Sequence, residues 1–223
     1  MTKQERDSRG EILARLASAF DAQTPCTDAS VRRKEPSRDA DRDALLNVLK
    51  GRLEENRTGF HLVSDRKALL EALANRVYFE RAASVAVDAG GMAGEPWFLD
   101  GLRVLLPGVE LVKAADVSPG ELERCEVGVT AASSVLAATG AMALSASTAG
   151  GLAASLLPRI HYVVARQSDV VQGLATWTAT ASREKGLYHV HVSGPSRTAD
   201  IEKKLVYGVH GPWKVSLFLL QSE

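Results

Sequence analysis

Short apolar runs recur along this chain, and segments with the apolar spacing of helices lie between many of them. The runs are at residues 60–64, 84–88, 109–112, 127–130, 142–145, 160–165, 188–192 and 215–220. The helical segments are at residues 41–57, 65–82, 152–157 and 169–182. This alternation is typical of strand–helix–strand units with parallel strands. We therefore predict an α/β fold with a largely parallel sheet flanked by helices.

The N-terminal part of the chain differs from the rest. Residues 8–20 carry apolar side chains at helical spacing and predict an amphipathic helix. Residues 23–38 contain prolines, several small polar residues and the basic run Arg32–Lys34, which is typical of a mobile linker. We therefore expect an N-terminal helix and linker over residues 1–39 and one α/β domain over residues 40–223.

Composition excludes several classes of protein. Lys plus Arg and Asp plus Glu both number 27, so the chain lacks the basic surplus of a nucleic-acid binder. No apolar run reaches the ~18 residues of a membrane span, and the first residues are too highly charged for a signal peptide. We therefore expect a cytoplasmic protein.

Metal and cluster sites are not expected on this chain. Cys26 and Cys125 lie far apart and belong to no Cys-x-x-Cys pair, so they cannot hold an iron–sulfur cluster or a structural zinc. His189 and His191 share one face of a predicted strand, but no third ligand is evident. We predict two reduced cysteines and no bound metal.

Two glycine-bracketed polar loops, at residues 193–200 and 208–212, are the strongest candidates for a site. The first follows the predicted strand at residues 188–192, and the second precedes the run at residues 215–220, with a short helix-like segment between them. Loops at strand ends carry function more often than the strands do, and their exposed N–H groups suit anions. We expect both loops to line one cleft together with Thr139-Gly140, at the carboxyl ends of strands where ligands of α/β sheets bind.

Each candidate residue also has a purely structural interpretation. Arg197 suits a carboxylate or phosphate, but the surrounding residues also fit a turn followed by a helix N-cap. His210 is either an acid, base or ligand partner, or a loop hydrogen-bonder. Gly140, after a helix-like alanine-rich stretch, is either part of the site or a C-cap. The residues predicted to bind a ligand are Thr139, Gly140, Gly194, Ser196, Arg197, Thr198, Asp200, His210 and Gly211, and no catalytic residue is assigned.

Four segments taken in order resemble the LUD domain family. They are Thr139-Gly140 before a strand, Ser155–Pro158 before Ile160-His161, residues 194–202 (GPSRTADIE) and residues 208–212 (GVHGP). The resemblance covers roughly residues 40–223, and the order and separation of the last two segments are its most specific part. It implies a fold similar to that of sugar-phosphate isomerases and CoA transferases, with a cleft at strand ends.

The resemblance also implies a function in the oxidation of L-lactate to pyruvate together with iron–sulfur partner proteins. The clusters would then lie on the partners, and this chain would contribute the binding of a small carboxylate or phosphate, or assembly. Alternatives are a stand-alone enzyme acting on a sugar phosphate or CoA thioester, and a scaffold without a catalytic site. The family usually has an acidic residue before Thr-Gly where this chain has Ala138, so chemistry that needs this carboxylate would be altered here.

Overall fold

The computed structural model describes residues 42–88, 90–146, 149–181, 188–199, 205–208 and 210–221. The expected N-terminal helix and linker, residues 1–39, lie outside the described residues and stay a prediction.

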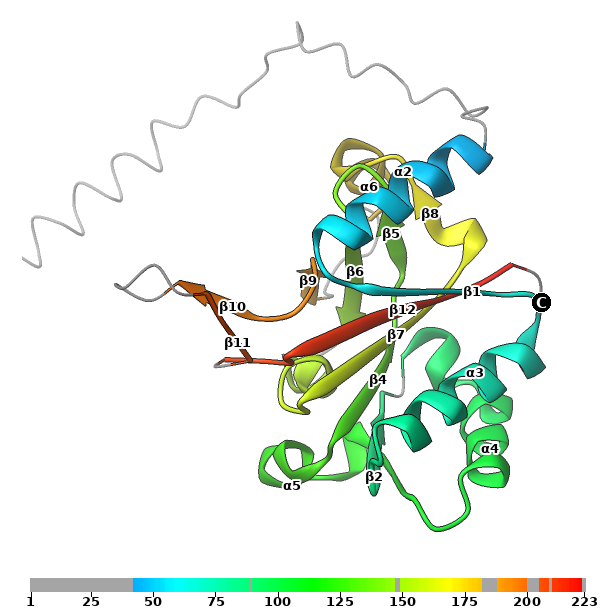
Figure 1. The fold of residues 1–223 in the computed structure, drawn as a ribbon, viewed down its shortest axis with the longest axis vertical. Coiled ribbons are helices and arrows are strands. Elements are labelled where there is room, and N and C mark those ends of the chain that lie inside the picture. Colours follow the sequence, from blue (N-terminus) through cyan, green and yellow to red (C-terminus); the bar gives the residue numbers. More distant parts are fainter. Residues whose placement is uncertain are drawn as a thin grey trace, which may run out of the picture. The chain divides into compact units, whose positions relative to one another are not determined.

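Six parallel strands form the main sheet (Figure 1). Their order across the sheet is β1 (Gly59–Val63), β12 (Lys214–Leu220), β7 (Ile160–Arg166), β4 (Val127–Ala131), β2 (Ser84–Val87) and β3 (Glu110–Lys113). The central strands are buried along almost their whole length, because both faces of a parallel sheet are covered. The predicted α/β fold with a largely parallel sheet is confirmed.

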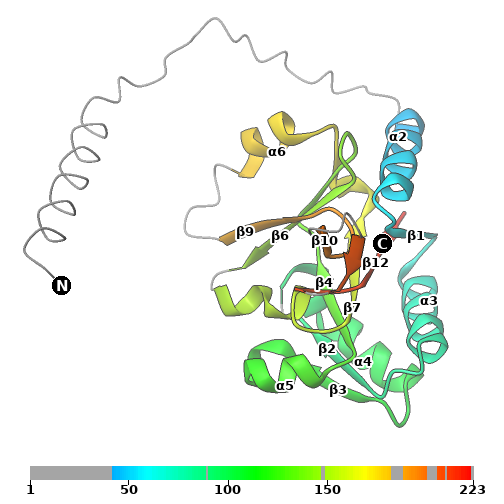
Figure 2. The same cartoon turned by 60° about the vertical axis from the view of Figure 1, so that its left-hand side comes forward.

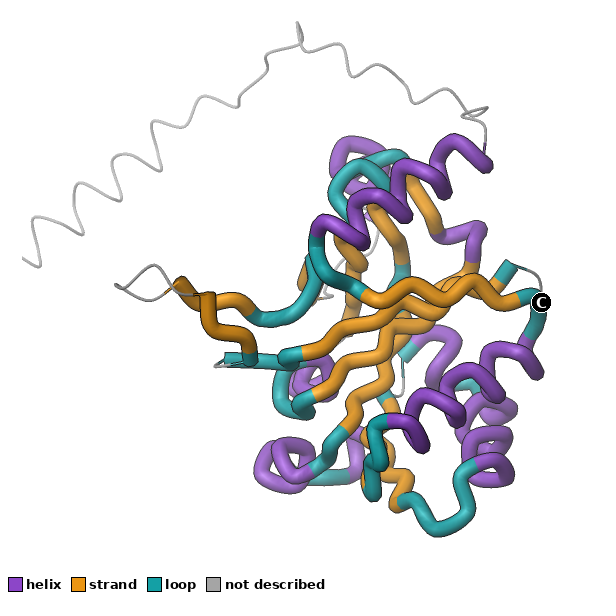
Figure 3. The backbone as a smooth tube through the Cα atoms, in the orientation of Figure 1, coloured by secondary structure: helices purple, strands orange, loops and turns teal. Residues whose placement is uncertain are grey.

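Helices cover both faces of this sheet, and Figure 3 shows them in purple on either side of the orange strands. On one face, α3 (Arg66–Phe79) and α4 (Pro96–Leu105) bury Leu69 and Phe98 against strand side chains such as Tyr162. On the other face lie α2 (Arg42–Glu55), which buries Leu49 and Leu53, and the short α5 (Pro119–Arg124). The core is therefore two apolar layers with the sheet between them.

Two helix starts follow from local sequence. The carboxylate of Asp65 accepts a hydrogen bond from the Ala68 N–H at 2.9 Å and caps α3. Ser118 and Glu121 form a capping box at the start of α5, with Pro119 at the first helical position. The cap at Asp65 lies at the start of the helical segment expected over residues 65–82.

A second, four-stranded sheet packs on the α2 side of the main sheet. Its order is β8 (Val170–Val171), β5 (Ser134–Leu136), β6 (Ala141–Ala146) and β9 (Tyr188–Val192), with β6 antiparallel to both neighbours. One of its faces joins the core beside α2, and α6 (Leu174–Ala181) lies on the other. Figure 2 shows β6 and β9 side by side, apart from the parallel strands.

The structure corrects three expectations about these later segments. The alanine-rich stretch before Thr139 contains β5 rather than a helix, because its side chains are buried between other elements. The helix expected over residues 169–182 is α6 alone, preceded by β8. Residues 197–199 of the first polar loop form a strand, β10 (Arg197–Ala199), which pairs antiparallel with β11 (Leu205–Tyr207) at the end of the expected helix-like segment. The earlier part of that segment lies outside the described residues.

Short 3₁₀ segments complete the described fold: η1 (Gly91–Gly94), η2 (Ala114–Asp116), η3 (Ala149–Ser155) and η4 (Gln167–Asp169). Within the described part of the chain, no helix combines the length and the hydropathy that crossing a bilayer requires.

Candidate functional site

Two of the segments predicted from the sequence, the first polar loop and Thr139-Gly140, meet at Asn56, just after the end of α2. The Asn56 side-chain amide donates a hydrogen bond to the backbone carbonyl of Thr139 at 2.8 Å. The Arg197 guanidinium donates to the backbone carbonyl of Asn56 at 2.5 Å. Arg197 thereby places its positive charge at the carboxyl end of a helix, where the backbone carbonyls favour a cation.

Two of the predicted glycines are required by this close packing. Gly194 has a φ of +92°, and a Cβ there would lie 2.3 Å from the carbonyl oxygen of Asn56. Gly140 has a φ of +66°, and a Cβ there would lie 3.0 Å from the Asn56 side-chain nitrogen. Any other residue would push these segments away from α2.

The two glycine-bracketed loops are tied directly to each other. The Ser196 N–H donates to the carbonyl of Pro212 at 2.9 Å, and the Gly208 N–H donates to the carbonyl of Ser196 at 3.1 Å. Gly211 also faces Ser196, since a Cβ on this glycine would lie 3.4 Å from the Ser196 Cβ. The backbone groups of Ser196 are therefore used within the protein.

This junction lies at the amino edge of the parallel sheet, because the loop at 208–213 leads into β12 and Thr58 precedes β1. The second loop precedes β12, as its place before residues 215–220 implied, so the junction does not lie at the carboxyl ends of strands that ligands of α/β sheets favour. The chain enters β12 directly after the second loop, so the polar groups of this loop lie at the amino edge of the sheet. Thr58 is buried there, and its hydroxyl has no hydrogen-bond partner among the described residues.

The side chains that this junction leaves exposed are cationic or aromatic. Arg197 and His210 are exposed, and the Trp213 side chain retains 44% of its surface. The Lys214 ammonium lies 5.7 Å from the Trp213 ring centre and 5.8 Å from that of Phe79, which is 71% exposed. We call Phe79, Arg197, His210, Trp213 and Lys214 the amino-edge surface.

Three further sequence predictions concern Asp200, Thr198 and Ala138. Asp200 lies outside the described residues, and only the backbone of Thr198, in β10, is described. Ala138 lies in the turn between β5 and β6, exposed, with its N–H donating to the carbonyl of Gln172 at 2.9 Å. The predicted role of the nine residues in binding a ligand stays a prediction.

The histidine pair on β9 takes part in a different arrangement. His189 Nδ1 lies 2.9 Å from the Ser145 hydroxyl, which in turn lies 3.0 Å from the Ser133 hydroxyl. The Trp177 ring packs edge-on against both His189 and His191. Partial burial and the nearby His189 lower the pKa of His191. Within the ranges the structure describes, no three His, Cys, Asp or Glu side chains gather as a metal site would require.

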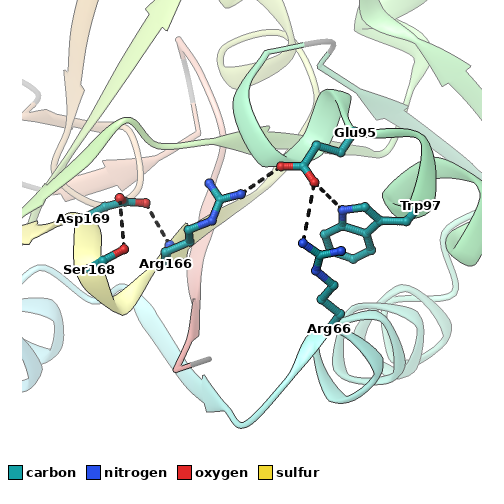
Figure 4. A network of polar contacts seen from close by, with 6 residues as sticks. All are labelled: Arg66, Glu95, Trp97, Arg166, Ser168 and Asp169. Atoms are coloured by element: carbon teal, nitrogen blue, oxygen red, sulfur yellow. Dashed lines mark hydrogen bonds and ion pairs between the residues drawn. The ribbon is translucent and has the colours of Figure 1, made fainter. Parts of the chain in front are cut away.

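A polar network at the carboxyl edge of the sheet was not foreseen from the sequence. The carboxylate of Glu95, just before α4, lies between two arginines and an indole (Figure 4). Arg166 at the end of β7 donates to Oε1 at 2.8 Å, while Trp97 Nε1 donates to Oε2 at 2.5 Å. Arg66 at the start of α3 lies 4.0 Å from Oε2 and stacks over the Trp97 ring at 4.8 Å. These hydrogen bonds and charges hold the pKa of Glu95 below its ordinary value, the Trp97 bond foremost.

Comparison with known proteins identifies the family. The LUD domain model matches residues 110–220. Lactate utilization protein C from Shouchella clausii is 30% identical over 196 residues, which covers 85% of this chain and 84% of that protein. The chain belongs to the LUD domain family. The resemblance noted in the sequence is confirmed.

Two further similarities extend this finding. Lactate utilization protein C from Deinococcus radiodurans is 32% identical over 156 residues, which covers 69% of this chain and 67% of that protein. The crystal structure of a DUF162 family protein from the same organism has a TM-score of 0.62 and 22% identity, covering 80% of this chain and 98% of that one. This structural likeness supports the α/β fold of the LUD domain described above.

Sequence reasoning missed Asn56 and the Glu95 network for different reasons. Asn56 stands in the polar run at residues 54–58, and its only signal is its position after a helix, where side-chain groups often satisfy helix ends. Arg66, Glu95 and Arg166 lie far apart in sequence and form no motif. The signal they share is their position at the carboxyl edge of the sheet. Arg166 ends a strand, Arg66 begins a helix, and Glu95 directly precedes a helix.

Proposed function

We propose that this LUD domain protein is a subunit of an L-lactate oxidation system and acts together with iron–sulfur partner proteins. The observation that carries the proposal is the similarity to Lactate utilization protein C over 85% of this chain. The clusters would lie on the partners, because Cys125 is buried and the sequence holds only one other cysteine. The contribution of this chain would be assembly, with a small anion bound within its own domain.

The amino-edge surface supports the assembly part of the proposal. Its aromatic and cationic side chains are of the types that dominate the binding energy of protein interfaces. The backbone groups of Ser196 are already paired with Gly208 and Pro212, so recognition at this junction would rest on the outward-facing side chains. Of its members, Arg197 carries an exposed positive charge, whereas the half-buried Lys214 donates a hydrogen bond to the largely buried carboxylate of Glu80. The exposed Arg197 suits an acidic group on a partner protein.

A growth experiment tests the proposal in living cells. The full chain is expressed in a bacterium that lacks its own Lactate utilization protein C but keeps the iron–sulfur proteins of lactate oxidation. We expect it to restore growth on L-lactate while growth on glucose is unaffected. Failure of the folded, expressed chain to restore growth on lactate would contradict the function.

Matched variants test the surface. Trp213→Ala and Arg197→Ala should slow growth on lactate and reduce co-purification of the iron–sulfur proteins, since loss of a central interface residue costs about 2 kcal/mol, or roughly 30-fold in Kd. Leu174→Ala, which removes an exposed apolar side chain from α6, is the control and should have no effect. Melting curves on all three variants confirm that each is folded. Equal growth and equal co-purification of all variants would show that partners bind elsewhere.

A further inference from the structure

The carboxyl-edge network contains the groups that recognise a carboxylate. Guanidinium groups bind carboxylates through charge-assisted hydrogen bonds, and an indole N–H adds a neutral donor. Here Arg166 and Trp97 each hold a different oxygen of Glu95, and Arg66 adds a second positive charge beside them. The Glu95 carboxylate is thus bound as a ligand carboxylate would be, by groups of the protein itself.

These groups come from separate elements that a parallel sheet brings to one edge. Arg166 ends β7, Arg66 begins α3 after β1, and Trp97 lies in the first turn of α4. The Arg166 N–H also donates to the Asp169 carboxylate at 3.0 Å, which fixes the backbone from which this arginine extends. Ligands of α/β sheets bind at this edge, beyond the carboxyl ends of the strands.

Space for a small ligand lies beside Glu95. A cavity of about 240 Å³ is lined by Glu95 and by the charged residues Asp88, Asp100, Arg103 and Lys113. Glu95 is the one member of the network that lines it, so a ligand would reach the two arginines and the indole through the place that the Glu95 side chain occupies. At ~30 Å³ per water molecule this volume equals roughly eight waters, enough for a small organic acid. The Glu95 side chain retains 35% of its surface, so its carboxylate can turn towards solvent while Met92 and Ala93, just before it, stay buried in the core.

We propose that Arg66, Arg166 and Trp97 form a binding site for a small aliphatic carboxylate, and that Glu95 holds the place of the ligand carboxylate until one displaces it. The site lies at the opposite edge of the sheet from the amino-edge surface. Its existence does not depend on the proposed function. That the ligand is a 2-hydroxy acid such as lactate, rather than another small carboxylate, does rest on that function.

The decisive variant is Glu95→Gln, which keeps the shape of the side chain and removes its charge. Calorimetric titration uses the purified full chain with sodium acetate, sodium L-lactate and, as an uncharged analogue, lactamide. We expect Glu95→Gln to bind both carboxylates at least about tenfold more tightly than the wild type and lactamide no better, because the competing carboxylate is gone. The double variant Glu95→Gln/Arg166→Gln should lose this binding.

The control is Glu121→Gln, which neutralises a carboxylate of the capping box at the start of α5, away from this network. It should bind acetate and L-lactate like the wild type. If Glu95→Gln binds no more tightly than the wild type, Glu95 only ties α3, α4 and β7 together, and the proposal is wrong.

A second measurement covers the case in which Glu95→Gln does not fold. Acetate that displaces Glu95 should change the fluorescence of Trp97 in the wild type, with saturation, and this change should be missing in Trp97→Phe. No saturable change in the wild type would overturn the site. Growth on lactate is measured separately, so tight carboxylate binding without growth contradicts the lactate role alone, and growth without carboxylate binding contradicts this site alone.

Discussion

At the scale of single residues, the buried His161 on β7 makes stability depend on pH. Its side chain is fully buried, and its Nε2 lies 2.8 Å from the Thr130 hydroxyl. Burial lowers the pKa of His161 to about 3, so the folded protein keeps the neutral imidazole. The unfolded chain takes up this proton near the ordinary pKa of about 6.5.

The free energy of unfolding should therefore fall as the pH drops from about 6.5 to about 3, by up to ~1.4 kcal/mol per pH unit from this residue. His161→Gln removes the titration and keeps a group that can hydrogen-bond to Thr130. Urea unfolding at several pH values should give the variant a shallower slope over this interval, whatever its stability at pH 7.5. Parallel curves for the two proteins would contradict the assignment.

At the scale of elements, the contact between β4 and η3 depends on Gly128. A Cβ at this position would lie 2.0 Å from the carbonyl oxygen of Ala154 and 3.0 Å from Pro158 Cγ. Gly128→Ala should destabilise the protein by about 1–3 kcal/mol or more, because η3 must move off the sheet. Gly51 is an exposed position of α2, and a Cβ there would have no atom within 4 Å. Gly51→Ala should therefore stabilise the protein by up to ~1 kcal/mol. Denaturant unfolding of both variants measures this difference, and similar values for the two would contradict it.

The sequence predicted elements well where one local signal decides them. The parallel strands follow from apolar runs buried on both faces, and Asp65 follows from the capping rule. The first loop contacts the second through Ser196 and shares Asn56 with Thr139, but that these segments line one cleft stays a prediction. Their place at the amino edge was not predicted, because local sequence patterns do not encode strand order. The strand β5 was missed because burial in a sheet overrides the helical preference of alanine. Contacts such as that between Glu95 and Arg166 join segments far apart in the sequence, so they cannot be predicted until the fold is known.

At the scale of the whole molecule, we predict that the purified chain is colourless and binds no metal stoichiometrically. Cys125 is buried, desolvation raises the pKa of its thiol, and the protein has one other cysteine, Cys26, far away in sequence. A thiol that stays protonated is a poor ligand, because metals bind the thiolate. Elemental analysis and a visible spectrum of the full chain check this. One equivalent of iron or zinc, or cluster absorption, would contradict the division of labour with iron–sulfur partners.

The order of strands in the main sheet also has a consequence during synthesis on the ribosome. β1 is an edge strand whose one neighbour in the described sheet is β12, and nearly the whole domain is translated between the two. At a translation rate of ~5–20 residues per second, β12 is synthesised on the order of ten seconds after β1. During that interval the nascent chain exposes unpaired strand edges and an uncovered apolar face. Chaperones bind such surfaces, and the same surfaces promote aggregation. Yield in a cell should therefore depend on chaperone supply more than the stability of the finished domain would suggest.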